Sequence, residues 1–332
     1  MKQYLIPHTG SYYKANLHSH STVSDGKFTP EEVKEAYKAK GYSVYAYTDH
    51  QVMLPHFDLA DEDFLPLTGY EIDITEQGKP WPNTKTCHIC LIALDPDNTT
   101  QPLLNLARVS DPRYVVSKTL IKTDETLAYY EHDYTPEAIN RVMQIAREKG
   151  FFVTYNHPVW SMEGYTEYSA YKYMNAFEIC NYGCVAEGYD EHNGQIYDEL
   201  LRQGQRLYCV ATDDNHSESH QFGGFTMIKA EKLDYKTITD ALVAGNFYAS
   251  EGPTIHDLWI EDGKVHITCD PAKEIFITNG VRRSRNVRNA DGLVTEAEFD
   301  VSKEDIYFRL TVIGEDGTKA YTNAYFTDEI EL

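Results

Sequence analysis

Two histidines two residues apart are the first feature of this sequence with the potential for chemistry. His18 and His20 stand in a segment that alternates like a β-strand, where residues two apart point to the same face. Two imidazoles on one strand provide half of a metal site, and Asp25, in the loop before Gly26, could hold a second cation beside the first. Because such a pair is common on exposed strands, further ligands must come from elsewhere in the chain.

The same residue types recur where the following strands end. Alternating or apolar runs predict seven strands, over residues 13–20, 43–48, 65–72, 86–94, 151–155, 176–180 and 207–212. Histidine or a carboxylate lies at or just after five of these ends, as His18/His20, Asp49/His50, Glu71, His157 and Asp214/His216, whereas His88 falls inside its strand. Chance would place each residue independently, so this recurrence favours one shared site.

Helices and loops separate these strands. Residues 29–32 (Thr-Pro-Glu-Glu) combine an N-cap, a first-turn proline and a capping-box glutamate, and predict a helix that ends at Gly41. Residues 135–150 and 190–203 are also expected to be helical. Strands that alternate with crossovers predict an α/β fold with a parallel barrel, in which chemistry lies at the carboxyl ends of the strands. Residues 95–134 interrupt this order as a polar insertion, often a lid or a pocket wall.

The sequence changes character after residue 252. Residues 255–326 alternate with a period of two and carry Asp-Gly pairs at 262–263 and 316–317, which are typical of tight hairpins. We therefore predict two domains, an α/β barrel over residues 1–252 and a small antiparallel β-sandwich over residues 253–332.

The composition of the 332-residue chain argues against some classes of partner. With 30 basic and 52 acidic residues, the formal charge of −22 disfavours nucleic acid polymers, but not a small anionic substrate, because bound cations dominate the local field of a site. The N-terminus lacks the apolar core of a signal peptide, and no run of about 18 apolar residues occurs. We expect a soluble, cytoplasmic protein without a membrane partner; the oligomeric state is not indicated.

The motifs together resemble those of the PHP (polymerase and histidinol phosphatase) family of metal-dependent phosphoesterases. The resemblance covers residues 13–220, with the motifs in order: His18-x-His20, Ser24-Asp25-Gly26, Thr48-Asp49-His50, Glu71, His88, Asn156-His157-Pro158 and Asp214-x-His216. It implies a distorted (β/α)7 barrel that holds two to three divalent ions. Residues 245–253 and the β-rich tail resemble one subgroup of this family, the carbaryl-hydrolase-like metallohydrolases.

The resemblance also implies which side chains bind the ions. One ion would take His18, His20, Glu71 and Asp214, a second Asp25, His50 and His216, and a third His88 and His157, with Glu71 bridging from the first. The residue types agree, because mixed nitrogen and oxygen donors suit zinc, manganese or iron better than calcium. Asp214 is chosen over Asp213 because only Asp214 has the two-residue offset that puts it on one strand face with His216.

The six cysteines are not expected among these ligands. They lie mostly in apolar runs, which favours buried, reduced thiols. Cys87 and Cys90 have the spacing of a zinc or redox pair, but no second pair of this kind accompanies them.

Further side chains are candidates for roles beside the ions. Asp213 could support a ligand or act as an acid or base, and His192 and His220 are candidates for the acid that protonates the leaving group. The insertion carries four cations that could close over a phosphate, although a solvated lid surface is the simpler interpretation: Arg108, Arg113, Lys118 and Lys122.

The expected function is hydrolysis of a phosphate ester in a small metabolite or nucleotide by metal-activated water. Two alternatives stay open. The same ions could serve to hydrolyse a non-phosphate ester, an amide or a carbamate, or the chain could be a catalytically silent metal-binding module. Silent members would be expected to have lost ligands, whereas this sequence keeps nine.

Overall fold

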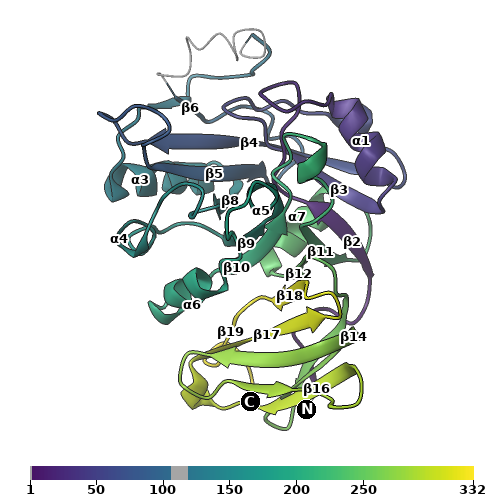
Figure 1. Cartoon of the computed structure of the whole chain (residues 1–332). Coiled ribbons are helices and arrows are strands. Elements are labelled where there is room, and N and C mark those ends of the chain that lie inside the picture. The colour runs from purple at the N-terminus through teal and green to yellow at the C-terminus, as the bar shows by residue number, and fades with distance from the viewer. Residues whose placement is uncertain (1, 106–118) are drawn as a thin grey trace.

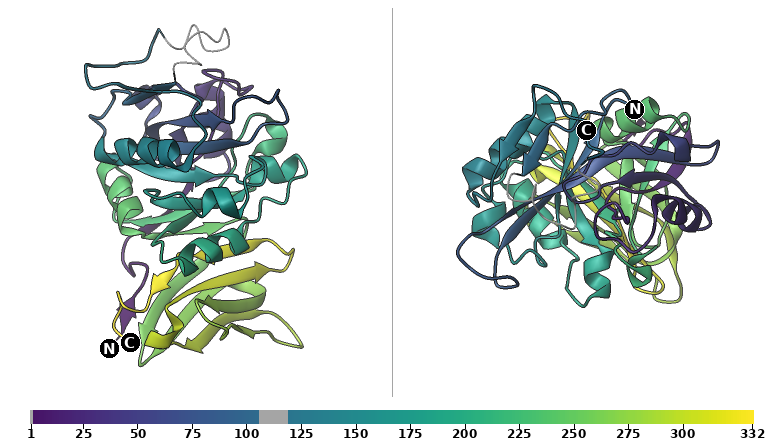
Figure 2. Two further views of the ribbon diagram at one scale, coloured as in Figure 1. Left: turned by 90° about the vertical axis from the view of Figure 1, so that its left-hand side faces the viewer. Right: turned by 90° about the horizontal axis from the view of Figure 1, so that it is seen from above.

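The computed structural model describes residues 2–105 and 119–332 of the chain. The molecule has two parts stacked along its long axis (Figure 1; Figure 2, left). The strands and helices from the first two thirds of the chain form the upper part in Figure 1, and the C-terminal strands form the lower part. Among the described residues, every helix is too short or too polar to cross a lipid bilayer.

The upper part is built on seven strands that pair in chain order. They are β2 (Ser11–Asn16), β3 (Tyr42–Tyr47), β4 (Leu65–Thr75), β5 (Thr86–Ala93), β8 (Phe151–Asn156), β9 (Ala176–Asn181) and β10 (Tyr208–Thr212). Strands β2 to β4 are parallel, and so are β8 to β10, but β5 is antiparallel to both β4 and β8. All seven predicted strands are present, but β2 ends at Asn16, so His18 and His20 follow this strand instead of lying within it. The all-parallel arrangement is wrong at β5.

The reversed direction of β5 explains the unusual position of His88. Because β5 is antiparallel, its amino end lies beside the carboxyl ends of its neighbours. His88 is the third residue of β5 and pairs with Asn156, the last residue of β8. A histidine inside a strand therefore reaches the same edge of the sheet as histidines that follow other strands.

The described strands do not close into the predicted (β/α)7 barrel. The first and last strands, β2 and β10, meet only beyond their carboxyl ends, where Ser19 and Asn215 form a parallel bridge. There the His20 amide donates to the Asn215 carbonyl at 3.3 Å, and the Asp214 amide donates to the His18 carbonyl at 3.0 Å. Along its length β2 pairs instead with β11 (Phe225–Ala230), so the fold is an α/β protein with a large mixed sheet. The bridge still brings both ends of the strand series to one site.

Helices cover the sheet, and their ends follow the sequence signals. They are α1 (Pro30–Lys38), α3 (Pro136–Glu148), α4 (Tyr165–Tyr168), α5 (Tyr182–Ala186), α6 (Gly194–Arg202) and α7 (Tyr235–Ala244), with 3-10 turns at Phe57–Leu59, Glu218–His220 and Lys303–Asp305. The predicted capping box at Thr29 and Glu32 is present at the start of α1. The third predicted helix begins at residue 194 rather than 190, because residues 191–193 pair with the end of β9.

The polar insertion is only partly described. Its described residues include a two-stranded parallel sheet of β6 (Leu103–Asn105) and β7 (Ala128–Tyr130). A buried network joins this sheet to the upper part, because Tyr130 donates to the side chain of Gln51 at 2.8 Å and Gln51 donates to Asp73 at 2.8 Å. The described part of the insertion is therefore attached to the framework rather than separate from it.

The C-terminal region is antiparallel, as predicted, and both Asp-Gly pairs lie at hairpin turns. Its strand β14 makes two sets of pairings, with β13 and β16 in its first half and with β15 and β17 in its second half, around one apolar core. The strands are β12 (Phe247–Ser250), β13 (Ile255–Glu261), β14 (Lys264–Asn279), β15 (Arg285–Val287), β16 (Val294–Asp300), β17 (Tyr307–Gly314), β18 (Lys319–Thr322) and β19 (Tyr325–Phe326), and β1 (Gln3–Tyr4) pairs with β13.

Two contacts hold the C-terminal strands against the upper part. Strand β12 pairs with β11 on one side and with β18 on the other, so the two parts share a continuous sheet. Arg309 of β17 makes a buried, two-pronged ion pair with Asp198 of α6, at 2.8 and 2.7 Å. The junction between the two parts is therefore both hydrogen-bonded and charge-paired.

Candidate metal centre

The side chain of Glu71 lies at the centre of the site. Glu71 lies in β4, where its backbone forms a parallel bridge with His50, and its carboxylate is fully buried. Five histidine nitrogens surround the two carboxylate oxygens: His18 Nε2 at 3.2 Å, His20 Nε2 at 3.4 Å, His50 Nδ1 at 3.0 Å, His88 Nδ1 at 3.0 Å and His157 Nε2 at 3.3 Å. Imidazoles that converge on one buried carboxylate form the donor set of a transition-metal centre.

A second carboxylate, Asp214, faces the same histidines from the opposite strand. Its Oδ1 lies 2.9 Å from His20 Nε2 and 3.2 Å from His18 Nε2, and its Oδ2 lies 3.8 Å from His157 Nε2. Asp214 has φ 48° and His157 has φ 25°, both in the left-handed region that L-residues rarely adopt. Backbone strain of this kind is kept where the position of a side chain matters more than local stability.

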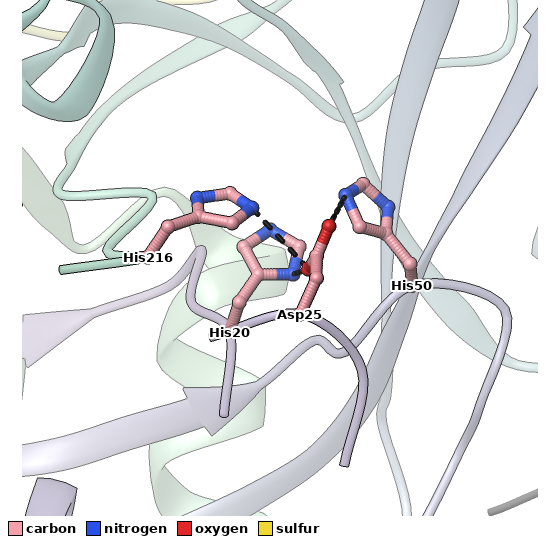
Figure 3. Close-up of side chains that lie close together, drawn as sticks. All are labelled: His20, Asp25, His50 and His216. Atoms are coloured by element: carbon pink, nitrogen blue, oxygen red, sulfur yellow. Dashed lines mark ion pairs between the residues drawn. The ribbon is translucent and has the colours of Figure 1, made fainter. Parts of the chain in front are cut away.

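The third carboxylate, Asp25, lies among three histidines at the open side of the site (Figure 3). Its oxygens are 3.4 Å from His216 Nε2, 3.8 Å from His20 Nδ1 and 3.8 Å from His50 Nε2. Donor atoms of these four side chains all lie within 4.8 Å of one another. The structure thus brings together all nine side chains that the sequence motifs indicated as ligands, from β4, β5 and the segments after β2, β3, β8 and β10.

Several buried donor atoms of the cluster have no hydrogen-bond partner. Glu71 Oε2, Asp214 Oδ1 and His20 Nδ1 are enclosed, yet none meets hydrogen-bond geometry within the described part of the chain. Buried polar atoms are nearly always paired, because leaving one unpaired costs roughly 1–3 kcal/mol. The unpaired atoms point toward other donors of the cluster, so these residues fit bound divalent cations.

The charges of the site are strongly coupled. Burial alone would raise the pKa of Glu71, but His18, His88 and His50 hold it well below its usual range. Burial lowers the pKa of His50, but Asp25 and Glu71 raise it to about 10. Burial together with the neighbouring histidines lowers the pKa of His20 to about 3. Metal ligation requires neutral imidazoles, so loading of the site must displace protons from residues such as His50.

Glu178, which the motif analysis did not single out, holds the candidate ligands His18 and His157 in position. Its carboxylate is fully buried and accepts hydrogen bonds from the His157 amide at 2.9 Å and from Asn181 Nδ2 at 2.9 Å, and it lies 2.9 Å from His18 Nδ1. A carboxylate behind a ligating histidine fixes the ring orientation and leaves the other nitrogen for a metal. The signal was available, because Glu178 is a lone acid inside an otherwise apolar strand.

Cys90 also lies against the site, although no cysteine was expected there. Its sulfur is within 4.8 Å of donor atoms of His18 and Glu71 and accepts a hydrogen bond from Asn156 Nδ2 at 3.0 Å. Burial raises the pKa of the Cys90 thiol to about 11. The thiol is therefore neutral near pH 7 and fills the floor of the site in the absence of a cation.

Asp213 does not lie in the cavity. Its buried carboxylate accepts hydrogen bonds from the backbone amides of residues 222–224 and from the Tyr37 hydroxyl. These bonds fix the turn after β10 that sets the direction of Asp214. Gly183 packs on this turn so closely that a Cβ would lie 2.7 Å from the Asp213 carbonyl oxygen. These contacts favour the first of the two roles expected for Asp213, support of the ligand Asp214, over the acid-base role.

Of the remaining candidate residues, some lie at the cavity and others do not. His220 lines the cavity, with Nε2 3.6 Å from Glu187 Oε1, whereas His192 pairs with Glu251 at 2.8 Å outside it. Of the four cations in the insertion, Arg108, Arg113 and Lys118 fall outside the described residues. Lys122 is exposed, lies 3.2 Å from the Thr99 hydroxyl, and is not part of the cavity wall.

The candidate ligand side chains form the floor of a cavity of about 770 Å³, a size suited to a small-molecule ligand. Trp160 stands against His88 and His157, and Trp81 packs on Trp160 at the exposed rim. Lys79 is the only lysine or arginine among the described lining residues, and it pairs with Glu76 at 2.8 Å. The cavity wall therefore presents tryptophans, histidines and carboxylates, and its described lysine is already paired.

One of the comparisons with known proteins identifies a family over the part of the chain that carries the site. A family model described as the PHP domain matches residues 16–215, which include all nine converging side chains. No curated protein matches the chain. The fold and the site define a metal-dependent hydrolase of the α/β class. The chain belongs to the PHP domain family.

Three solved structures resemble the chain at low identity. One is a two-domain protein from Bacteroides vulgatus containing a predicted PHP-like metal-dependent phosphoesterase, with 14% identity, coverage of 97% of this chain and 98% of that chain, and a TM-score of 0.45. An amidohydrolase from Chromobacterium violaceum has 16% identity, coverage of 61% and 88%, and a TM-score of 0.38. PsfC from Pseudomonas syringae has 14% identity, coverage of 70% and 88%, and a TM-score of 0.39.

These superpositions are loose, so the family assignment depends on the family match alone. That match ends at residue 215 and does not reach the C-terminal strands. The resemblance of residues 245–253 and the tail to the carbaryl-hydrolase-like subgroup therefore stays a prediction.

Replacing Glu178 with Gln should loosen the metal centre without removing a ligand. The amide keeps the shape but cannot orient His18 and the His157 amide as a carboxylate does, so metal affinity should fall about 10- to 100-fold. Competition with a chromogenic chelator measures this affinity. Glu199→Gln, which changes a carboxylate bound to Tyr168 away from the site, is the matched control and should leave it unchanged. Equal affinities of wild type and Glu178→Gln would contradict the supporting role.

Glu163 gives the segment that carries His157 a measurable pH dependence. Its buried carboxylate accepts hydrogen bonds from the hydroxyls of Tyr134, Tyr155 and Tyr171, and its amide bonds to the Pro158 carbonyl. Burial raises the pKa of Glu163 from 4.5 to about 7, although the tyrosines oppose this. The folded protein therefore holds a proton there that the unfolded chain has lost between these two pH values.

The stability linked to this proton is fully present below about pH 4.5 and lost as the pH rises through about 7. Relative to Glu163→Gln, which stays neutral, the free energy of unfolding of the wild type should fall by about 3 kcal/mol across this interval. Urea denaturation of both proteins at several pH values measures the difference. Parallel pH profiles would show that Glu163 does not carry the raised pKa.

Proposed function

We propose that the nine converging side chains hold two or three divalent ions of zinc, manganese or iron. His18, His20, Glu71 and Asp214 would hold the first, Asp25, His50 and His216 the second, and His88 and His157 the third together with Glu71. Two clusters of close donor atoms support the first two ions, His18–His20–Asp214 and His20–Asp25–His50–His216. A third, His50–Glu71–His88, holds His50 where the proposal has His157. His20 and His50 each belong to two clusters, so the proposed ion sites would be direct neighbours.

We infer that the protein is a phosphoesterase that hydrolyses a small phosphorylated metabolite or nucleotide. The observation that carries this proposal is the convergence of five histidines on the buried carboxylate of Glu71 at the floor of the cavity. When bound, the ions supply a water of lowered pKa and neutralise the oxygens of the substrate. The ligand set is intact, which argues against a catalytically silent module.

The residues of the chain would prepare the site for this chemistry. Glu178 fixes the orientation of His18 and His157, and Asp213 fixes the turn that carries Asp214. Little reorganisation is therefore needed when substrate binds. Trp160 covers one side of the histidines and would keep bulk water away from the reacting group. His220, beside Glu187 in the cavity wall, would give a proton to the leaving oxygen.

One observation favours a second candidate, hydrolysis of a non-phosphate ester, amide or carbamate. Among the described lining residues, the only lysine or arginine is Lys79, and Glu76 already pairs with it. A neutral substrate would need no cation in the wall, whereas a phosphate must be neutralised by the bound ions themselves.

We also propose that residues 1–252 form the catalytic domain and residues 253–332 an accessory β domain, acting together on a small-molecule substrate in the cytoplasm.

Phosphate release distinguishes the two candidate functions. The protein is loaded in turn with manganese, zinc and iron and incubated with phosphomonoesters, nucleotides and sugar phosphates, and inorganic phosphate is measured. We expect release that chelation abolishes and that Asp214→Asn lowers by more than about 100-fold, beyond the effect of an outer-shell change. Asp240→Asn, at an exposed ion pair on α7, should have no effect. No release from any loaded sample, together with cleavage of carbamates or amides, would replace the phosphoesterase proposal with its alternative.

The role of His220 predicts a dependence on the leaving group. A general acid matters most when the departing oxygen is strongly basic, so His220→Gln should lower kcat about 10²- to 10⁴-fold for alkyl phosphates and far less for nitrophenyl phosphate. Steady-state kinetics on both substrates measure the ratio. An equal loss on both would show that His220 supports the cavity wall and does not transfer a proton.

A further inference from the structure

A second cluster of metal-binding side chain types lies outside the cavity. It consists of Cys180 near the end of β9, His192 before α6, and Glu251 after β12, whose donor atoms lie within 4.8 Å of one another. His192 Nε2 is 2.8 Å from Glu251 Oε1. Cys180 is fully buried, and His192 keeps 28% of its side chain exposed. None of the three lines the cavity of the first site.

The backbone holds these three side chains in place. Cys180 and His192 are partners in an antiparallel bridge. On one side of it the Asn193 amide donates to the Ile179 carbonyl at 2.7 Å, and on the other the Asn181 amide donates to the Glu191 carbonyl at 3.4 Å. The Glu251 amide bonds to the carbonyl of Lys319 on β18 at 2.9 Å. The cluster therefore joins a strand end of the upper part to the first turn of the C-terminal strands, and its geometry does not depend on flexible segments.

The chemistry of the cluster suits zinc. One thiol, one imidazole and one carboxylate are donors that zinc binds in tetrahedral sites with three protein ligands. Asp190 Oδ1 lies 3.4 Å from His192 Nδ1, where it can orient the ring from behind, as carboxylates do for metal-bound histidines. Without a cation, burial and Glu251 raise the pKa of the Cys180 thiol well above its usual range. The thiol proton lies beside the Glu251 carboxylate, so a cation bound between them would take the place of this proton.

We propose that Cys180, His192 and Glu251 bind a zinc ion that fastens the C-terminal strands to the metallohydrolase part. Binding would release the thiol proton of Cys180 to solvent, and His192 would bind through Nε2 as a neutral imidazole. The exposed side of His192 leaves room for water as the fourth ligand. This site is separate from the catalytic centre and does not depend on the proposed function.

Cobalt reports a thiolate ligand directly, because a cobalt–sulfur bond gives a near-ultraviolet charge-transfer band that nitrogen and oxygen ligands lack. Metal-free full-length protein is titrated with Co²⁺ alone. We expect this band in the wild type, its loss in Cys180→Ser, and its retention in Cys90→Ser, which alters a cysteine beside His18 and Glu71 of the first site. Loss of the band in Cys90→Ser with retention in Cys180→Ser would overturn the proposal, and so would a wild type without the band.

Two further variants keep the test decisive if Cys180→Ser does not fold. Glu251→Gln keeps the thiol and the size of the side chain, and should weaken cobalt binding at the charge-transfer band about tenfold or more. His256→Ala is the matched control, because it removes a surface His–Asp pair of the same region, 3.1 Å from Asp270, that lies outside the proposed site. It should leave the band unchanged. Glu251→Gln with wild-type cobalt affinity would exclude the carboxylate as a ligand and overturn the three-residue site.

Discussion

The burial of one carboxylate among five imidazoles is the constraint on which this structure depends. Glu71 is fully enclosed, and an isolated buried carboxylate would be strongly destabilising. Protons on some of the histidines compensate its charge in the free protein, as the raised pKa of His50 and the depressed pKa of Glu71 indicate. Divalent ions would compensate it better, because they bring the unpaired oxygens and nitrogens of the cluster into bonds. Bound ions would therefore offset the cost of folding such a site more fully than the histidine protons do.

The fold meets this constraint by bringing strand ends together from both directions. Parallel strands bring His18, His157 and Asp214 to one edge, and the antiparallel strand β5 adds His88 from its amino end. A closed barrel is not required, because the Ser19–Asn215 bridge already joins the first and last strands at the site. Buried acids then fix the ligands. Glu178 holds His18 and His157 from below, and Asp213 holds the turn that carries Asp214.

Much of this arrangement was readable in the sequence, since strand ends and helix caps are local signals. The caps at Thr29 and Asp234 begin α1 and α7 as local chemistry dictates, and all nine candidate ligands meet in space. The direction of β5 was not readable, because parallel and antiparallel buried strands show the same apolar runs. The failure to close the barrel depends on pairing between distant strands, which no local pattern encodes.

The supporting residues were harder to predict than the ligands. Asp213 and Asp214 are adjacent and chemically identical, and only the amides of residues 222–224 show that Asp213 belongs to the framework. Cys90 lies at the site because it is opposite Glu71 in the β4–β5 register, which depends on the reversed strand. His192 was considered for the catalytic site, whereas the structure places it at the junction between the two parts. In each case the tertiary partner, not the residue type, decides the role.

Anomalous diffraction from crystals of the manganese-loaded protein tests most directly whether the Glu71 cluster holds metal ions. We predict anomalous peaks within bonding distance of Glu71 and Asp214 and between Asp25, His50 and His216. Peaks found only elsewhere, with the nine side chains still paired to one another, would contradict the account.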